Sequence, residues 1–199
     1  MMHLAVFASG GGTNFQSLIE GLDRRYAKIE VLIASKEGIY AIERAKKANI
    51  PYAVIGKEQY SDIDERFRAI DAVLTEKSVD GILLAGYLTV LPAWFIEKYQ
   101  NRIVNIHPAY LPRHGGVGCY GMRVHRAVVE NQEDYSGVTV HLVTEKVDGG
   151  AILSQEKYPV YPWDSPESVA EKGHVVEQYI YKNTVNVWVK QALTKEKER

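Results

Sequence analysis

The first half of the chain alternates short apolar runs with segments of helical periodicity, and this alternation restricts the possible folds more than any other feature. Apolar, β-branched runs occupy residues 4–9, 29–35, 81–87 and 102–106. Apolar side chains recur at helical spacing in residues 14–23, 41–48, 61–78 and 92–99. Strands that alternate with helices pair in parallel through right-handed crossovers. The pattern therefore predicts an α/β fold with a mostly parallel twisted sheet flanked by helices.

The alternation of predicted strands and helices ends after Pro108. A glycine-rich segment, LPRHGGVGCYGM, leads to a short predicted helix near residues 124–131. Two strand-like runs, 137–143 and 151–160, enclose the turn TEKVDGG and are expected to pair antiparallel. Residues 169–193 predict one long helix or two helices, followed by a charged tail, KEKER, that we expect to fray. No repeat or linker divides the chain, so residues 1–199 are expected to form a single domain.

Composition narrows the class of protein. The 24 Lys and Arg residues nearly balance the 25 Asp and Glu residues, and no run of one sign suggests a nucleic-acid or membrane surface. No apolar run reaches the ~18 residues of a membrane span, and the N-terminal run is too short for a signal peptide. The single cysteine, Cys119, allows no internal disulfide. A cytoplasmic protein that acts on small molecules is expected.

The loop ASGGGTN, residues 8–14, lies between the first predicted strand and helix. Glycines there let the backbone approach a ligand, and the free N–H groups at the start of the helix suit a phosphate. The alternative is a tight turn in which Thr13 or Asn14 caps the helix. The loop matches neither GxxxxGK[ST] nor GxGxxG, which disfavours a nucleoside triphosphatase and a dinucleotide-linked oxidoreductase.

Asn105 and His107 stand two residues apart at the end of a predicted strand, in VNIHP. Side chains alternate along a strand, so both point to the same face. An amide and an imidazole with an ordinary pKa of about 6.5 could together stabilise an oxyanion and donate a proton, as acyl transfer requires. The alternative is that Asn105 satisfies backbone groups at the strand end and His107 is a turn residue.

Asp148, in VDGG, fits a hairpin turn, and that interpretation is the stronger one from local sequence alone. The glycine loop, the segment after residues 81–87 and the NIHP segment all follow parallel strands, so they should share one edge of the sheet, where ligands bind. His141 reads as an ordinary strand residue, and Cys119 has no visible base partner. No histidine falls in a metal-binding pattern, so we predict no metal.

Taken together, four segments resemble the folate-dependent phosphoribosylglycinamide formyltransferase family of purine synthesis. They are SGGGTN, LLAGYLTVLP (83–92), NRIVNIHPAYLP (101–112) and SGVTVHLVTEKVDGGAILSQ (136–155). The resemblance spans almost the whole chain and implies a formyltransferase-like fold. It implies a mononucleotide-binding half over about residues 1–100 and a folate-binding, catalytic half over about residues 101–199.

The resemblance also implies roles for individual residues. Asn105, His107 and Asp148 match the family's catalytic trio, and Gly12, Thr13 and Asn14 match its phosphate-binding loop. Glu177 matches an acidic residue that contacts the ribonucleotide substrate. The folate-binding positions are Leu88, Thr89, Val90, Leu91 and Glu145. The implied cosubstrate is 10-formyltetrahydrofolate, the acceptor is 5-phosphoribosylglycinamide, and the protein would be a monomer or homodimer.

The segment RHGGVGCYGMRV, by comparison with that family, is longer by about five residues. The alternatives from other classes are formyltetrahydrofolate deformylase, which is a hydrolase, and a non-catalytic nucleotide- or folate-binding module. A methionyl-tRNA formyltransferase would require a basic RNA-binding region, which the balanced charge disfavours.

Overall fold

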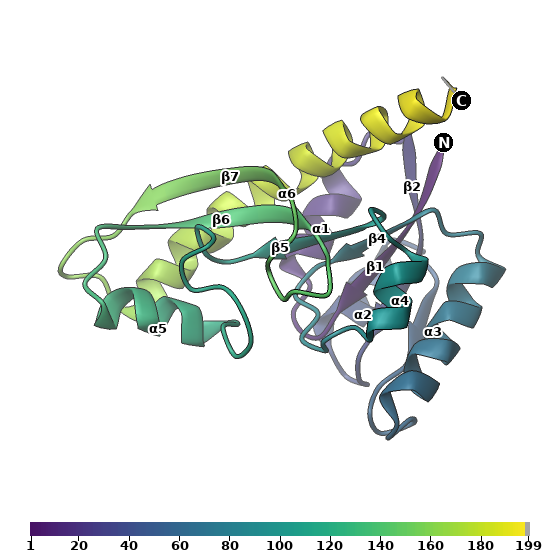
Figure 1. The fold of residues 1–199 in the computed structure, drawn as a ribbon, viewed down its shortest axis with the longest axis horizontal. Coiled ribbons are helices and arrows are strands. Elements are labelled where there is room, and N and C mark those ends of the chain that lie inside the picture. Colours follow the sequence, from purple (N-terminus) through teal and green to yellow (C-terminus); the bar gives the residue numbers. More distant parts are fainter. Residues whose placement is uncertain (198–199) are drawn as a thin grey trace.

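The computed structural model describes residues 1–197, which form one seven-stranded sheet with helices on both faces (Figure 1). The strand order is β3-β2-β1-β4-β5-β6-β7. β1 to β5 run parallel, while β6 pairs antiparallel with both β5 and β7. The predicted fold class is thereby confirmed. The strands are β1 Met2–Ala8, β2 Ala27–Ala34, β3 Tyr52–Val54, β4 Gly81–Leu84, β5 Ile103–His107, β6 Tyr135–Leu142 and β7 Ile152–Pro159.

Six helices occur among residues 1–197 and cover the sheet in two layers. They are α1 Thr13–Gly21, α2 Tyr40–Lys47, α3 Ile63–Glu76, α4 Ala93–Lys98, α5 Met122–Glu130 and α6 Pro166–Lys197. Alternate side chains of β1 enter opposite layers of the core: Leu4 and Val6 pack with α1, α2 and α6, whereas Ala5 and Phe7 pack with α3 and α4. This two-residue alternation explains why the central strands read as continuous apolar runs, since both of their faces are buried.

Several local predictions need correction. The three-residue strand β3 was not predicted, because it is too short to show a period. Of the two alternatives for residues 169–193, the single long helix is confirmed, and only its bounds change: α6 has 32 residues. Neither Thr13 nor Asn14 caps α1: the N-cap residue is Gly12, in the left-handed conformation with no side-chain cap. The tail continues as helix through Lys197, and the rest of the expected frayed segment lies outside the described residues.

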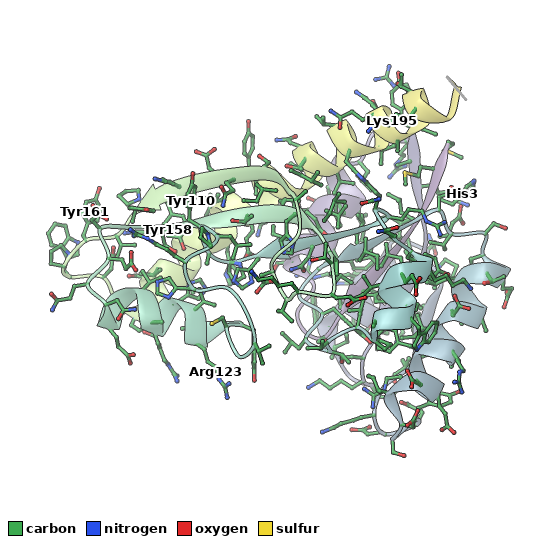
Figure 2. The ribbon with its side chains drawn as sticks, viewed as in Figure 1. His3, Tyr110, Arg123, Tyr158, Tyr161 and Lys195 are labelled. Atoms are coloured by element: carbon green, nitrogen blue, oxygen red, sulfur yellow. The ribbon has the colours of Figure 1, made fainter. Side chains whose placement is uncertain are left out.

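Helix α6 ties the sheet together. It packs against α1, α5 and strands β5, β6 and β7. Tyr181, fully buried on this helix, directs its hydroxyl at two main-chain carbonyls, 2.9 Å from Leu84 O and 3.3 Å from Val104 O. One side chain thus joins α6 to the neighbouring strands β4 and β5. His3, on β1, lies near one end of the molecule, and Tyr161, just after β7, lies near the other (Figure 2).

The strand order reverses direction between β1 and β4, which is where ligands bind in open α/β sheets. The glycine loop follows β1, and residues 85–91 follow β4 beside it. His107 ends β5, the next strand along. The three loops therefore meet at one edge, as predicted. None of the helices in residues 1–197 combines the length and apolar character needed to cross a membrane.

Candidate active site

A cleft of about 560 Å³ opens at the carboxyl edge of the parallel strands. Its walls come from the glycine loop, the loop after β4, the end of β5, the glycine-rich loop 113–121, the loop after β6 and helix α6. Every residue predicted as a site residue lines this cleft: Gly12, Thr13, Asn14, Leu88, Thr89, Val90, Leu91, Asn105, His107, Glu145, Asp148 and Glu177. The structure brings these positions together, and their individual roles stay predictions.

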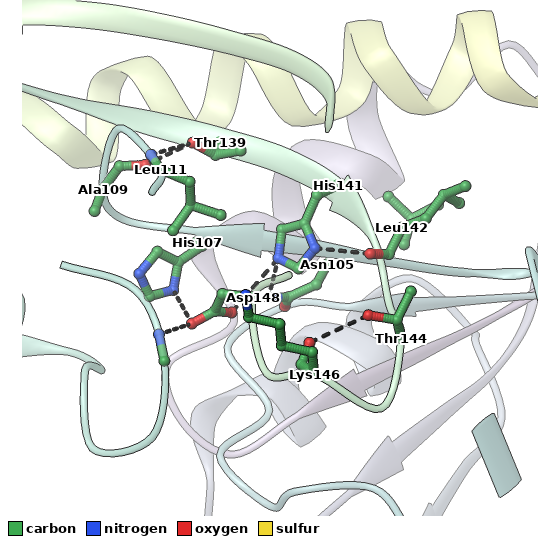
Figure 3. Close-up of polar contacts among 12 residues, drawn as sticks. Asn105, His107, Ala109, Leu111, Thr139, His141, Leu142, Thr144, Lys146 and Asp148 are labelled. Carbon is green, nitrogen blue, oxygen red and sulfur yellow. Dashed lines mark hydrogen bonds and ion pairs between the residues drawn. The ribbon is translucent and has the colours of Figure 1, made fainter. Parts of the chain in front are cut away.

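Asn105, His107 and Asp148 converge at the centre of the cleft (Figure 3). Asn105 and His107 share a face of β5, and Asp148 reaches them from the loop after β6. Nδ1 of His107 lies 3.6 Å from Oδ2 of Asp148. That separation is longer than a direct hydrogen bond, so the pair interacts mainly through charge. Asp148 does adopt the positive φ of 53° that its turn sequence predicts, and its side chain nonetheless enters the cleft.

His141 belongs to this site, although the sequence suggested an ordinary strand residue. It lies opposite Asn105 in the antiparallel register of β5 and β6, and its side chain is almost completely buried. Nδ1 of His141 donates to the carbonyl of Leu142 at 2.8 Å, which leaves Nε2 to accept from Nδ2 of Asn105 at 3.1 Å. Nε2 also lies 3.6 Å from Oδ1 of Asp148. His141 therefore orients the Asn105 amide with its NH₂ group toward the site.

Burial and charge compete at the trio. Burial lowers the pKa of His107 below its ordinary value, and the neighbouring Asp148 carboxylate opposes this only in part. Burial also disfavours ionisation of Asp148, but the nearby His141 and His107 side chains and the N–H of Gly116 favour the carboxylate more strongly, so the pKa of Asp148 is lowered. Asp148 is accordingly ionised at neutral pH and able to accept a proton.

The glycine loop forms one end of the cleft. Gly12 has φ of 70°, and a Cβ added there would lie 2.8 Å from the Cβ of Ala41, so only glycine fits. Asn14 is buried and donates from Nδ2 to Oε2 of Glu177 at 3.0 Å, while its Oδ1 has no hydrogen-bond partner among residues 1–197. Burial raises the pKa of Glu177. Polar groups held out of water in this way favour a polar ligand.

The wall formed by the loop after β4 is apolar and exposed. Leu88 is 58% exposed and Val90 62% exposed, and both line the cleft beside the buried Leu91. The main chain here is held in place because the N–H of Leu88 donates to Oγ of Ser9 at 3.1 Å. Exposed apolar side chains around a cleft suit a flat, largely apolar ring system. Among residues 1–197 no three His, Cys, Asp or Glu side chains are grouped so that they could hold a metal ion.

The glycine-rich loop touches two members of the trio through its main chain, which sequence reasoning missed. Nε2 of His107 donates to the carbonyl of His114 at 2.9 Å. The N–H of Gly116 donates to Oδ2 of Asp148 at 2.9 Å. Backbone contacts carry no residue-specific signal, so only the length of this loop and its glycines pointed to it.

Comparison with known proteins agrees with this geometry. Residues 2–185 match the profile described as "Formyl transferase". The chain belongs to the formyl transferase family. It is 39% identical over 183 residues to a phosphoribosylglycinamide formyltransferase of Haemophilus influenzae, covering 91% of this chain and 84% of that protein. The chloroplastic phosphoribosylglycinamide formyltransferase of Arabidopsis thaliana is 40% identical over 186 residues, covering 92% of this chain and 63% of that protein.

Solved structures in the formyl transferase family superpose well. The crystal structure of glycinamide ribonucleotide transformylase 1 from Symbiobacterium toebii has a TM-score of 0.88 and 29% identity, with 96% of this chain and 89% of that chain covered. A formyltetrahydrofolate deformylase from Pseudomonas syringae has a TM-score of 0.85 at 22% identity, covering 96% of this chain and 62% of that chain. At that identity the second likeness shows a shared fold alone.

Proposed function

We propose that this protein transfers the formyl group of 10-formyltetrahydrofolate to the amine of 5-phosphoribosylglycinamide, a step of purine synthesis. The convergence of Asn105, His107 and Asp148 at the centre of a cleft with one polar end and one apolar wall carries the proposal. The relatives named above carry the same activity in their names. Sequence identity and site geometry therefore both support this formyl transfer.

The two substrates would occupy different parts of the cleft. The N–H groups of Gly12, Thr13 and Asn14 would hold the substrate phosphate, because the start of α1 carries positive potential. Glu177 would contact the ribose or the amine. At the other wall, Leu88 to Leu91 would hold the pteridine, with Glu145 nearby. In this arrangement the formyl group would lie beside Asn105 and His107.

The reaction follows from these groups. The neutral amine attacks the formyl carbon, a new C–N bond forms, and negative charge develops on the formyl oxygen. Nδ2 of Asn105 donates to that oxygen, and His107 stabilises it by charge once its Nδ1 has taken up a proton. Asp148 accepts the amine proton and passes it to the folate nitrogen, which leaves neutral when its C–N bond breaks. No covalent enzyme intermediate is required.

A direct assay tests the proposal. Purified protein is mixed with 10-formyltetrahydrofolate, with and without 5-phosphoribosylglycinamide, and folate release is followed by absorbance. Release that depends on the acceptor is expected. Release without the acceptor would instead identify a hydrolase, and binding of both compounds without release would identify a non-catalytic module. A cytoplasmic location and a monomeric or homodimeric state stand beside this proposal as predictions, and light scattering tests the second.

A further inference from the structure

The glycine-rich loop is anchored outside the cleft by an acidic residue that no part of the proposed mechanism uses. Glu133 lies in the turn between α5 and β6, with its side chain 16% exposed. Its Oε1 lies 3.0 Å from Nε2 of His114, and its Oε2 lies 2.5 Å from the guanidinium of Arg113. One carboxylate thus holds two consecutive side chains at the start of the loop.

His114 also has an unusual backbone. Its φ is 52°, a left-handed conformation that is uncommon for residues other than glycine and marks a constrained position. This conformation points its carbonyl at His107, whose Nε2 lies 2.9 Å away. The side chain of His114 therefore faces Glu133 while its main chain faces the cleft. Residue 114 therefore connects the Glu133 carboxylate to His107 in the cleft.

The contact between His107 and the His114 carbonyl determines which ring nitrogen of His107 carries a proton. A carbonyl oxygen only accepts hydrogen bonds, so Nε2 of His107 must carry a proton. In the neutral ring the lone pair is then on Nδ1, the nitrogen that lies 3.6 Å from Asp148. If the carbonyl moved away, the two neutral tautomers of His107 would no longer be distinguished by this bond.

We infer that Glu133 and His114 are positioning residues: by anchoring the loop they keep a proton on Nε2 of His107 and leave Nδ1, facing Asp148, as the atom that exchanges protons. This inference rests on the proposed function for its catalytic consequence, but the tautomer itself can be measured without any substrate.

The charged and titratable groups around His107 come from several elements. They are Asp148 from the loop after β6, His141 on β6, His114 in the glycine-rich loop and His125 on α5. Asp148 and the His114 carbonyl favour the cation of His107, while the rings of His141 and His114 disfavour it. Loss of the carbonyl contact should therefore lower the pKa of His107 further.

The test combines NMR with kinetics. In ¹⁵N-labelled wild-type protein at a pH where His107 is neutral, two-bond ¹H–¹⁵N correlations are expected to show the Nε2–H tautomer. In Glu133→Ala we expect a mixture of tautomers, a kcat lower by about tenfold, KM values within about twofold, and an alkaline limb of the kcat profile displaced to lower pH. Glu133→Gln keeps an oxygen that accepts from His114 and should restore most of kcat.

The matched control is Glu130→Ala, which removes an exposed carboxylate from the end of α5 that makes no ion pair within residues 1–197. It should leave the tautomer and kcat unchanged. Should Glu133→Ala fail to fold, His114→Asn removes the contact with Glu133 while tolerating positive φ, and the same outcomes are expected.

Two results would overturn the inference. The first is an Nδ1–H tautomer in the wild type. The second is a folded Glu133→Ala or His114→Asn variant with the wild-type tautomer and pH profile, which would make the anchor merely structural. Failure of the proposed function looks different, because wild-type protein would then show no acceptor-dependent release whatever its tautomer.

Discussion

Removal of the Asn105 amide tests the oxyanion assignment most directly. Nδ2 of Asn105 carries two protons, and the structure uses one of them in the 3.1 Å hydrogen bond to His141. The other is free for the formyl oxygen. Loss of one such donor lowers kcat by about 100-fold to 1000-fold, which corresponds to about 2.7–4 kcal/mol of transition-state stabilisation. We expect Asn105→Ala to fall in that range.

The same substitution has a smaller effect on stability. It removes one hydrogen bond and leaves Nε2 of His141 without its donor, at a cost of about 1–2 kcal/mol. For a domain of this size each 1 kcal/mol lowers Tm by about 2–4 °C, so the variant should still be folded at 25 °C.

The assay measures kcat with both substrates saturating, together with Tm by calorimetry. Gln100→Ala, which truncates an exposed amide side chain just before β5, is the control and should match the wild type in both. A folded Asn105→Ala protein with the wild-type rate would refute the assignment of Asn105 as an oxyanion donor.

Three further predictions concern the polar end of the cleft and its neighbours. Gly12→Ala should lower the free energy of unfolding by about 1–2 kcal/mol and weaken substrate phosphate binding, because Gly12 has a φ of 70° and the added Cβ would meet a neighbouring side chain. The control is Gly10→Ala, which has open space around its added Cβ, and both variants are compared by urea denaturation and substrate titration. Burial raises the pKa of Glu177, so its contribution to stability is largest at low pH and is lost as pH rises through the raised pKa. The Glu177→Gln variant should therefore be more stable than the wild type at pH 8, while its KM for the acceptor increases about tenfold. Burial lowers the pKa of His125 from 6.5 to about 4, so between these pH values the unfolded chain binds the proton and the free energy of unfolding falls as pH falls. His125→Gln should reduce this dependence of stability on pH in denaturation curves recorded from pH 7 to pH 4. An unchanged pH dependence would contradict the lowered pKa of His125.

The sequence predicted the fold class because each central strand is buried on both faces and each helix has one apolar face, and such patterns are local. It predicted the meeting of Asn105 and His107 because two-residue alternation fixes their shared face. Strand β3 could not be predicted because three residues show no period. The place of His141 in the site could not be predicted for another reason. Its position opposite Asn105 depends on the antiparallel register, which is set by long-range packing.

The loop 113–121 shows the same limit at the site. Its glycines and extra length indicated an unusual backbone, but not which carbonyl would face His107. That depends on the side-chain contacts between His114 and Glu133, which are 19 residues apart in the sequence. The Asn14 to Glu177 hydrogen bond spans 163 residues, and no local pattern predicts it.

Helix α6 has a consequence for how this cleft can be altered by mutation. Glu177 and Tyr181 stand one helical turn apart, and they bind the glycine loop through Asn14 and the strands β4 and β5 through two carbonyls. A shift or rotation of the helix would therefore displace the glycine loop and the strand that bears Asn105 together. Specificity for one substrate is consequently easier to redesign from the loops than from α6, where a change made for the acceptor would also reach the reacting centre.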